Sequence, residues 1–345
     1  MFRVVNPLTL KEIALALKVS PSTVSLVLNQ KEGVSATTRS KVLAMLDENG
    51  YSLSPQRTVG ENRGNIRFLK YTKHSLLVDG NEGFVSSIID SAEREARKKG
   101  FNFIITSFGE DMIDEVFATL CEDPLDGIIM LGTELEPKHY HYLEGLKIPF
   151  VVVDNHLKFY EADSIVMNNE DIVYMAIKHL AGLGHKHIGY LHSNINTGNF
   201  SERYCAYSKA LNELGLEYNT SHIYSVGVTM QNAYESMLEL LQQSGVKFPS
   251  ALFADNDTIA LGSIKALKSN GYHIPNDISI IGFDDIPFCK MADPPLTTMK
   301  VPTEDIGKWT VRRLHYRINH PNSPVTKMQF GASLVCREST QVYQK

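Results

Sequence analysis

Apolar residues recur with a helical period in three short segments at the start of the chain. The apolar positions of each segment fall on one helix face: Leu10, Ile13, Ala14 and Leu17 in the first, Val24, Val27 and Leu28 in the second, and Val42, Leu43 and Leu46 in the third. Ser20 followed by Pro21 predicts the start of the second helix, because a serine hydroxyl accepts a hydrogen bond from a free amide and proline suits the first helical position. Ser35 is predicted to cap the third helix, and Gly50 to end it.

The second predicted helix turns small side chains, Ser22 and Ser25, outward together with Leu26. A helix with small exposed side chains can enter the major groove of DNA while a preceding helix rests on the backbone. Charge supports this interpretation. Residues 1–67 hold 9 Lys and Arg against 5 Asp and Glu and are therefore basic, whereas the whole chain has a net charge of −5. The alternative is a helical hairpin that only packs on the rest of the chain. We predict a helix-turn-helix DNA-binding domain over residues 1–52.

From Ile66 onward, short apolar runs alternate with amphipathic segments. Strands are predicted over 65–71, 102–108, 127–132, 149–154, 187–192, 251–255 and 278–284, and helices over 86–100, 168–184 and 256–271. This alternation predicts an α/β fold with parallel sheets covered on both faces. The length of 66–345 favours two doubly wound lobes. We expect lobe 1 to comprise about 66–160 and 287–318, and lobe 2 about 161–286 and 319–345.

Polar residues follow several of the predicted strands. Asp154 follows one strand, residues 255–257 follow another, and Asp284 and Asp285 end a third. Ligands of parallel sheets bind outside the carboxyl ends of the strands, and in a two-lobed protein these ends can face one cleft. The pattern therefore predicts a ligand-binding cleft between the lobes.

Several other functions are not favoured. The four cysteines lie far apart, which argues against a disulfide framework or a zinc site. The histidines at 139, 141, 185 and 187 have no acidic or cysteine partners at ligand spacing. Asp284 and Asp285 are adjacent and point in different directions, so a catalytic pair is not expected. We predict no catalytic residues, no metal and no cofactor, and, without an export signal or membrane segment, a cytoplasmic protein that binds no membrane.

The segments TLKEIALALKVSPSTVSLVLN (9–29) and GVSATTRSKVLAMLDENGY (33–51) closely resemble the DNA-binding domain of the lactose-repressor (LacI/GalR) family of bacterial transcription regulators. The resemblance implies that Pro21, Ser22 and Leu26 read bases. It also implies that Thr9 binds DNA and that a second set contacts mainly phosphate: Thr23, Ser25, Asn29, Ser35 and Thr38. Leu26 stands where the family usually has arginine, so a guanine contact is replaced by apolar contact with a thymine methyl. Lys18 replaces the usual turn glycine and is expected to be strained if its φ is positive.

The segment 53–65 departs from the family pattern of a short hinge helix that inserts a leucine into the minor groove. Pro55 is displaced, and Gly60 occupies the expected leucine position. Its glycines and Asn62 oppose a stable helix. Either a shorter hinge helix forms with Val59 as the inserted side chain, or the linker contacts DNA in another way. We expect a flexible linker in the absence of DNA.

Residues 66–340 resemble the effector-binding core of the same family, which is similar in fold to periplasmic sugar-binding proteins. Matching segments include DGIIMLG, LAGLGHKHIGYL, FADNDTIALGSIKALKSNGYHIPNDISIIGFDD and PPLTTMKVPTEDIG. The resemblance implies a set of effector-binding positions: Phe84, Asp154, Arg203, Val228, Asn256 and Asp284. Val228 stands where many sugar-responsive relatives place Trp or Phe, so a stacking contact from that wall is not expected.

Together these features predict a repressor of carbohydrate-metabolism genes whose operator affinity is altered by a sugar-like effector in the cleft. One helix-turn-helix reads only a few base pairs, so a homodimer, or a tetramer, on a pseudo-palindromic double-stranded DNA operator is expected. Two alternatives remain. One is a solute-binding protein for sugars, a function that would explain the cleft but not the DNA-binding domain. The other is a regulator that responds to a nucleoside or to a protein co-regulator. A sugar-metabolising enzyme also accounts for the cleft, but no nucleophile and base are grouped in a motif.

Overall fold

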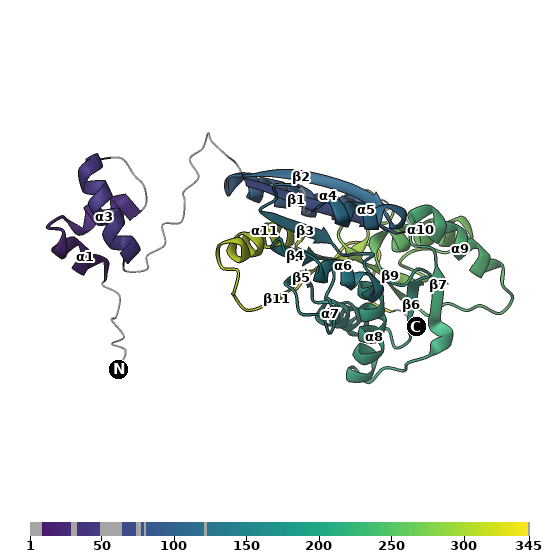
Figure 1. Ribbon diagram of the computed structural model, residues 1–345. Coiled ribbons are helices and arrows are strands. Elements are labelled where there is room, and N and C mark those ends of the chain that lie inside the picture. Colours follow the sequence, from purple (N-terminus) through teal and green to yellow (C-terminus); the bar gives the residue numbers. More distant parts are fainter. Residues whose placement is uncertain are drawn as a thin grey trace, which may run out of the picture. The chain divides into compact units, whose positions relative to one another are not determined.

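The computed structural model describes residues 9–28, 33–48, 64–73, 77–78, 81–120 and 123–343. The chain divides into two compact units, residues 1–63 and residues 64–345, hereafter the head and the core (Figure 1). Among the sequence predictions, Asn29, Val59 and nearly all of the linker 53–65 lie outside the described residues.

The head contains helices α1 (Leu10–Ala16), α2 (Pro21–Leu28) and α3 (Ala36–Glu48). Their inward side chains are buried together: Ile13, Ala14, Val24, Val27, Val42 and Leu46. The predicted caps are confirmed, since the hydroxyl of Ser20 accepts from the amide of Thr23 at 3.1 Å and that of Ser35 from the amide of Thr38 at 3.2 Å. Lys18 adopts a φ of 52° in the turn between α1 and α2, a left-handed conformation that is strained for a residue other than glycine.

The core contains two sheets whose neighbouring strands are parallel, apart from one antiparallel pair, β10 and β12. The first sheet, in the order β11-β5-β4-β3-β1-β2, consists of β1 (Gly64–Thr72), β2 (Phe101–Gly109), β3 (Gly127–Leu131), β4 (Phe150–Val153), β5 (Ser164–Met167) and β11 (Lys327–Phe330). The second, in the order β12-β10-β9-β8-β6-β7, consists of β6 (Ile188–Ser193), β7 (Ile223–Val226), β8 (Ala251–Ala254), β9 (Ser279–Asp284), β10 (Thr297–Lys300) and β12 (Ser333–Val335). Each sheet forms the centre of one lobe (Figure 1).

Helices cover both faces of each sheet. Lobe 1 carries α4 (Glu82–Lys98), α5 (Ile113–Thr119), α6 (Tyr140–Glu144) and α11 (Thr303–Asn319). Lobe 2 carries α7 (Asn169–Gly182), α8 (Gly198–Glu213), α9 (Met230–Gln242) and α10 (Asp257–Ser269). In lobe 1, α4 packs against α11, and in lobe 2, α7 packs against α8 and α9 against α10. This arrangement confirms the predicted pair of doubly wound lobes.

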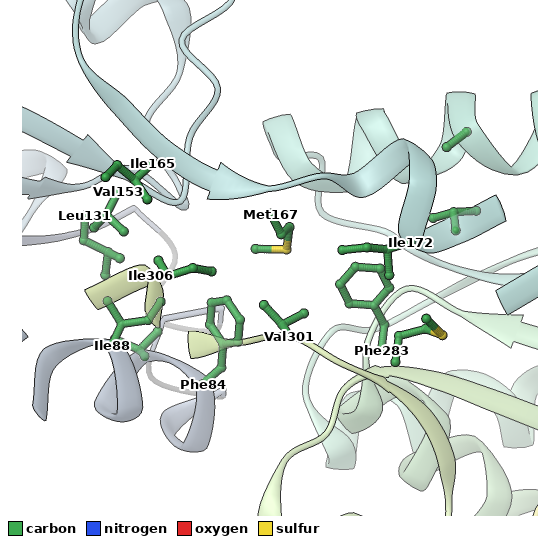
Figure 2. Close-up of a cluster of buried hydrophobic side chains, with 14 of the residues drawn as sticks. Phe84, Ile88, Leu131, Val153, Ile165, Met167, Ile172, Phe283, Val301 and Ile306 are labelled. Atoms are coloured by element: carbon green, nitrogen blue, oxygen red, sulfur yellow. The ribbon is translucent and has the colours of Figure 1, made fainter. Parts of the chain in front are cut away.

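One hydrophobic cluster extends through both lobes. Along β1, Ile66 and Phe68 face this cluster, whereas Leu69 and Tyr71 face a second one on the opposite side of the sheet. Figure 2 shows the continuation of the first cluster from Phe84 and Ile88 of α4 past Met167 to Phe283 of β9. The lobes therefore share apolar packing where the chain passes between them.

The predicted lobe boundaries differ from the structure at three strands. Strand β5 was predicted in lobe 2 but pairs with β4 in the first sheet, and β11 likewise pairs with β5 there. Strand β10 was predicted in lobe 1 but pairs with β9 in the second sheet. The physical reason is that each of these strands takes its backbone hydrogen bonds from a sheet of the lobe that the chain has not yet left. The chain therefore crosses between the lobes after β5, β10 and β11 rather than before them.

Candidate functional site

The outward face of α2 carries the side chains predicted to read DNA. Pro21, Ser22 and Ser25 are exposed, and Leu26 is partly buried. The hydroxyl of Ser22 lies 2.6 Å from that of Ser20, so the helix cap and the exposed face share hydrogen bonds. Of the predicted phosphate contacts, Ser35 is exposed and Thr23 and Thr38 are partly so.

Thr9 forms a capping box with Glu12 at the start of α1. The amide and the hydroxyl of Thr9 each lie 2.7 Å from the Glu12 carboxylate. These hydrogen bonds lower the pKa of Glu12. The local fold therefore fixes Thr9 at an exposed helix start, where backbone amides favour an anion.

A cleft between the two lobes of the core collects five of the predicted effector-binding residues: Phe84, Asp154, Arg203, Asn256 and Asp284. Each is positioned by a regular element: Phe84 lies on α4 and Arg203 on α8, Asp154 follows β4, Asp284 ends β9 and Asn256 caps α10. The cavity between these side chains is about 30 Å³, which suffices for one or two water molecules. A ring-sized ligand therefore requires the lobes to separate or side chains to move.

Asp154 is buried at the lobe 1 wall and held in a left-handed conformation, with a φ of 65°. Its carboxylate accepts from the Thr133 hydroxyl at 2.6 Å and from the Asn199 amide at 2.9 Å. Burial raises the pKa of Asp154 to about 6, because these hydrogen bonds and the Arg203 charge offset the desolvation only in part. Because Asn199 belongs to α8 in lobe 2, this contact crosses between the lobes.

Asp284 faces the cleft from the lobe 2 wall, with a φ of 119°. Its Oδ2 accepts from the Asn81 amide of lobe 1 at 2.9 Å. Its Oδ1 is buried and has no hydrogen-bond partner among the described residues. Burial raises the pKa of Asp284 to about 8 despite the opposing Arg203 charge. A buried carboxyl oxygen without a hydrogen-bond partner is costly, so this atom favours a ligand hydroxyl, which can donate to the carboxylate or accept from the protonated acid.

Asp285 has a different role, as predicted from its direction on the strand. Its carboxylate pairs with Arg337 at 2.5 Å, and both side chains are largely buried. The adjacent aspartates therefore divide into one that lines the cleft and one that fastens the C-terminal segment to lobe 2.

Arg203 is buried between the two walls. Its Nε donates to the Asn169 side chain at 2.9 Å, one Nη donates to the Asp255 carbonyl, and the other lies 3.1 Å from the Met167 sulfur. The guanidinium also stacks over the Phe283 ring at 3.6 Å from its centroid. These contacts hold a planar donor in one orientation between two carboxylates.

Sequence reasoning did not identify several residues of the cleft: Leu77, Asn81, Val85, Thr133, Met167, Thr197, Asn199 and Phe200. Asn81 precedes α4, but its side chain makes no cap hydrogen bond and serves Asp284 instead. In the sequence, Asn81 could have been noticed only as a residue type that often caps a helix. That pattern does not indicate that its side chain bonds Asp284 in the other lobe. Val228 does not line the cleft; it is buried behind the cleft wall with Leu77 and Phe200.

The histidine pairs serve local structure. His139 accepts from the amide of Glu136 at 3.2 Å, and His185 lies 2.8 Å from the Ser250 hydroxyl. Within the part of the chain that the structure describes, no group of three or more His, Cys, Asp or Glu side chains could hold a metal ion. In that same part, no helix has the length and apolar character needed to cross a membrane.

Comparison with known proteins supports both units. Residues 9–54 match the model of bacterial regulatory proteins, lacI family, and residues 177–340 match the periplasmic binding protein-like domain. The ribose operon repressor of Haemophilus influenzae is 30% identical over 96% of this chain and 98% of its own. A transcriptional repressor, PurR, of Vibrio campbellii is also 30% identical, with the same coverage. The Lac repressor bound to ONPG superposes with a TM-score of 0.71 at 25% identity over 97% of this chain and all of the other. The chain therefore belongs to the lacI family of bacterial regulatory proteins, DNA-binding transcription regulators with a helix-turn-helix head and a two-lobed core.

Proposed function

We propose that α2 reads an operator through Pro21, Ser22 and Leu26, and that Thr9, Thr23, Ser25, Ser35 and Thr38 contact phosphates. The exposed hydroxyls beside the helix start and the partly exposed Leu26 on the same helix support this assignment. Asn29 and Val59 complete the proposed set from the sequence alone. Leucine offers no hydrogen bond, so it recognises a thymine methyl rather than a guanine.

A Leu26→Arg variant is expected to select a different operator. A guanidinium can donate twice to guanine, which is worth about 1–3 kcal/mol at one base pair. In vitro selection with the full chain should therefore enrich guanine at one symmetric position of each half-site. Leu15, on α1, is 81% exposed, and Leu15→Arg is the control, because it adds the same charge without changing the selected sequence. Identical operators for wild type and Leu26→Arg would contradict the proposed register.

The cleft is proposed to bind a sugar or a sugar-like effector, and we assign it no enzymatic activity. The unpartnered Oδ1 of Asp284 carries this proposal, because a ligand hydroxyl would satisfy it. Arg203, Asn256 and the aromatic faces of Phe84 and Phe200 complete a set of groups suited to a polyhydroxylated ring. The relative named as a ribose operon repressor supports a sugar as the effector. Because other relatives are named PurR, nucleosides and nucleobases are included in the ligand screen described below.

Effector binding is proposed to alter operator affinity through the contacts that cross between the lobes. The Asn199–Asp154 and Asn81–Asp284 hydrogen bonds join the cleft walls directly. A ligand that replaces them changes how the lobes meet, and a coupling of about 1–3 kcal/mol would suffice for regulation. A thermal-shift screen of sugars and nucleosides, followed by operator binding with each hit, tests this. A hit that leaves operator affinity unchanged would contradict it. As a regulator of bacterial DNA, the protein is proposed to act in the cytoplasm.

A homodimer is proposed to form through exposed apolar side chains on both lobes. On lobe 2 a surface groove is lined by Met230, Leu261, Ile264, Phe288 and Met291. Phe288 and Met291 are 64% and 87% exposed. On lobe 1, the edge strand β2 exposes Ile104 and Ile105. Exposed apolar groups gathered in this way mark protein interfaces, and a dimer presents two heads to a palindromic operator.

A Met291→Asp variant is expected to be monomeric at concentrations where the wild type is dimeric, because it places a charge in the apolar contact. Operator affinity should fall at least about 100-fold, since a single head binds only one half-site. Sedimentation and operator titration measure both effects. Val342, 63% exposed in the C-terminal segment, provides the matched control Val342→Asp, which should stay dimeric. A dimeric Met291→Asp protein would contradict this interface.

A further inference from the structure

A second, larger cavity adjoins the effector cleft and is called the outer groove. Three segments line it: residues 134–140 after β3, residues 155–160 after β4, and residues 196–202 at the start of α8. Its volume is about 850 Å³, against about 30 Å³ in the cleft. Thr197 lines both cavities. The outer groove therefore begins where the cleft ends, and it receives residues from both lobes.

The segment 155–160 displays an aromatic ring from a fixed base. The Asn155 amide donates to the carbonyls of Gly132 at 2.9 Å and Leu135 at 2.8 Å, and its Oδ1 accepts from the amide of Leu157 at 2.9 Å. Phe159 is fully exposed and has a φ of 60°. A left-handed conformation is unfavourable for an aromatic residue, and solvent exposure of the ring adds to the cost. An exposed, strained ring at the mouth of a cavity is typical of a binding surface.

Two further aromatic rings line the outer groove beside Phe159. Tyr140 and Tyr160 lie with their ring centroids 5.2 Å apart, and the Tyr140 hydroxyl donates to Asn155 at 3.3 Å. The rings therefore offer apolar faces, while the hydroxyl is held by the same asparagine that fixes the loop.

Two glutamates of the outer groove are paired with basic side chains. Glu202 lies 3.1 Å from His156 and 3.2 Å from Lys158, which lowers the pKa of Glu202 to about 2. Glu136 lies 2.6 Å from Lys73 and 3.4 Å from Lys138. Paired charges do not attract an ionic ligand, but their oxygens and nitrogens can still exchange hydrogen bonds with hydroxyls. Aromatic faces beside paired polar groups fit a neutral polyhydroxylated ring.

We propose that the outer groove holds a second sugar ring of the effector, joined glycosidically to the ring in the cleft. This inference rests on the proposed sugar-binding function of the cleft. The effector is then a disaccharide or a longer glycoside, with its distal ring stacked against Phe159. Because the groove combines lobe 1 loops with the start of α8, the distal ring contacts both lobes and strengthens the coupling between ligand and lobe arrangement.

The test is calorimetric titration of the full chain with hexoses and with disaccharides built from them. A disaccharide is expected to bind at least about tenfold more tightly than its parent monosaccharide. Phe159→Asn should remove this gain and leave monosaccharide affinity unchanged; asparagine is chosen because it tolerates a left-handed conformation. Asp154→Asn, within the cleft, should weaken both ligands. Val342→Asn, an exposed apolar position outside the groove, should change neither affinity.

The outcomes separate the two proposals. Equal affinity for a monosaccharide and its disaccharides, or an equal loss of both in Phe159→Asn, overturns the outer-groove inference while sugar binding in the cleft stands. No binding of any carbohydrate overturns both.

Discussion

Replacing Arg203 with methionine is expected to abolish the effector response and to lower the free energy of unfolding of the core by about 3–5 kcal/mol. Methionine retains much of the apolar stem but removes every donor. The Asn169 side chain and the Asp255 carbonyl then lose their buried partner. Asp154 and Asp284 also lose the cation that opposes their desolvation, so the pKa of each rises further. The variant is therefore expected to lose effector binding and also the hydrogen bonds that hold the two cleft walls together.

Thermal unfolding and operator titration with and without effector measure these effects separately. Arg203→Lys should recover part of the stability, because the charge remains, but little of the effector affinity, because a lysine cannot supply the planar fork. Arg97→Met is the matched control: Arg97 lies 3.3 Å from Glu93 on α4, the two side chains are 64% and 41% exposed, and the loss of this pair should cost about 1 kcal/mol or less. An Arg203→Met protein that still responds to effector would exclude Arg203 from the site.

An Asp284→Asn variant is expected to be more stable than the wild type near pH 7.5 while losing effector affinity. The pKa of Asp284 is raised from 3.8 to about 8 in the folded protein. Between these values the folded state holds a proton that the unfolded chain has released, so folding stability falls as the pH rises through this window. Each pKa unit corresponds to about 1.4 kcal/mol. Asparagine cannot ionise and removes this cost, and its oxygen can still accept from Asn81.

Unfolding temperatures of both proteins from pH 5 to pH 8.5 test the sign. The stabilisation by Asp284→Asn should be small at pH 5 and should grow towards pH 8, with a smaller contribution to the wild-type slope from Asp154, whose pKa is about 6. Asp285→Asn is the control, because it breaks the ion pair with Arg337 and should destabilise the core. A difference between Asp284→Asn and wild type that does not vary with pH would show that ionisation of Asp284 is not the cause.

These two variants concern residues that the sequence indicated, but their energetics depend on neighbours that it did not indicate. Asp154 and Asp284 were predicted because polar residues that follow apolar strands lie at the carboxyl edge of a parallel sheet. Their partners Asn199 and Asn81 come from the other lobe in each case. No periodicity links positions so far apart in the chain. Contact between lobes thus determines which hydrogen bonds satisfy each carboxylate.

The segment after β8 also shows that the sequence alone does not identify which polar residues reach the cleft. Three consecutive polar residues, 255–257, follow this strand, but only Asn256 lines the cleft. Asp255 instead accepts from the amide of Ser193 at 2.7 Å, and Asp257 accepts from the Thr298 hydroxyl at 2.6 Å. Both aspartates are buried structural groups, which alternation along a chain cannot distinguish from ligand contacts.

By itself, the sequence determined the local structure: the helix starts at Ser20 and Ser35, the helical period of the head, and the apolar strands β3, β4, β8 and β9 at the centre of each sheet. These features follow from interactions within a few residues of each other. Only the tertiary structure determined the short strands β5, β10 and β11, the places where the chain crosses between lobes, and the network around Arg203. The physical reason is that these strands and the buried polar groups are stabilised by partners distant in sequence, and those partners are defined only when the chain has folded into its two lobes.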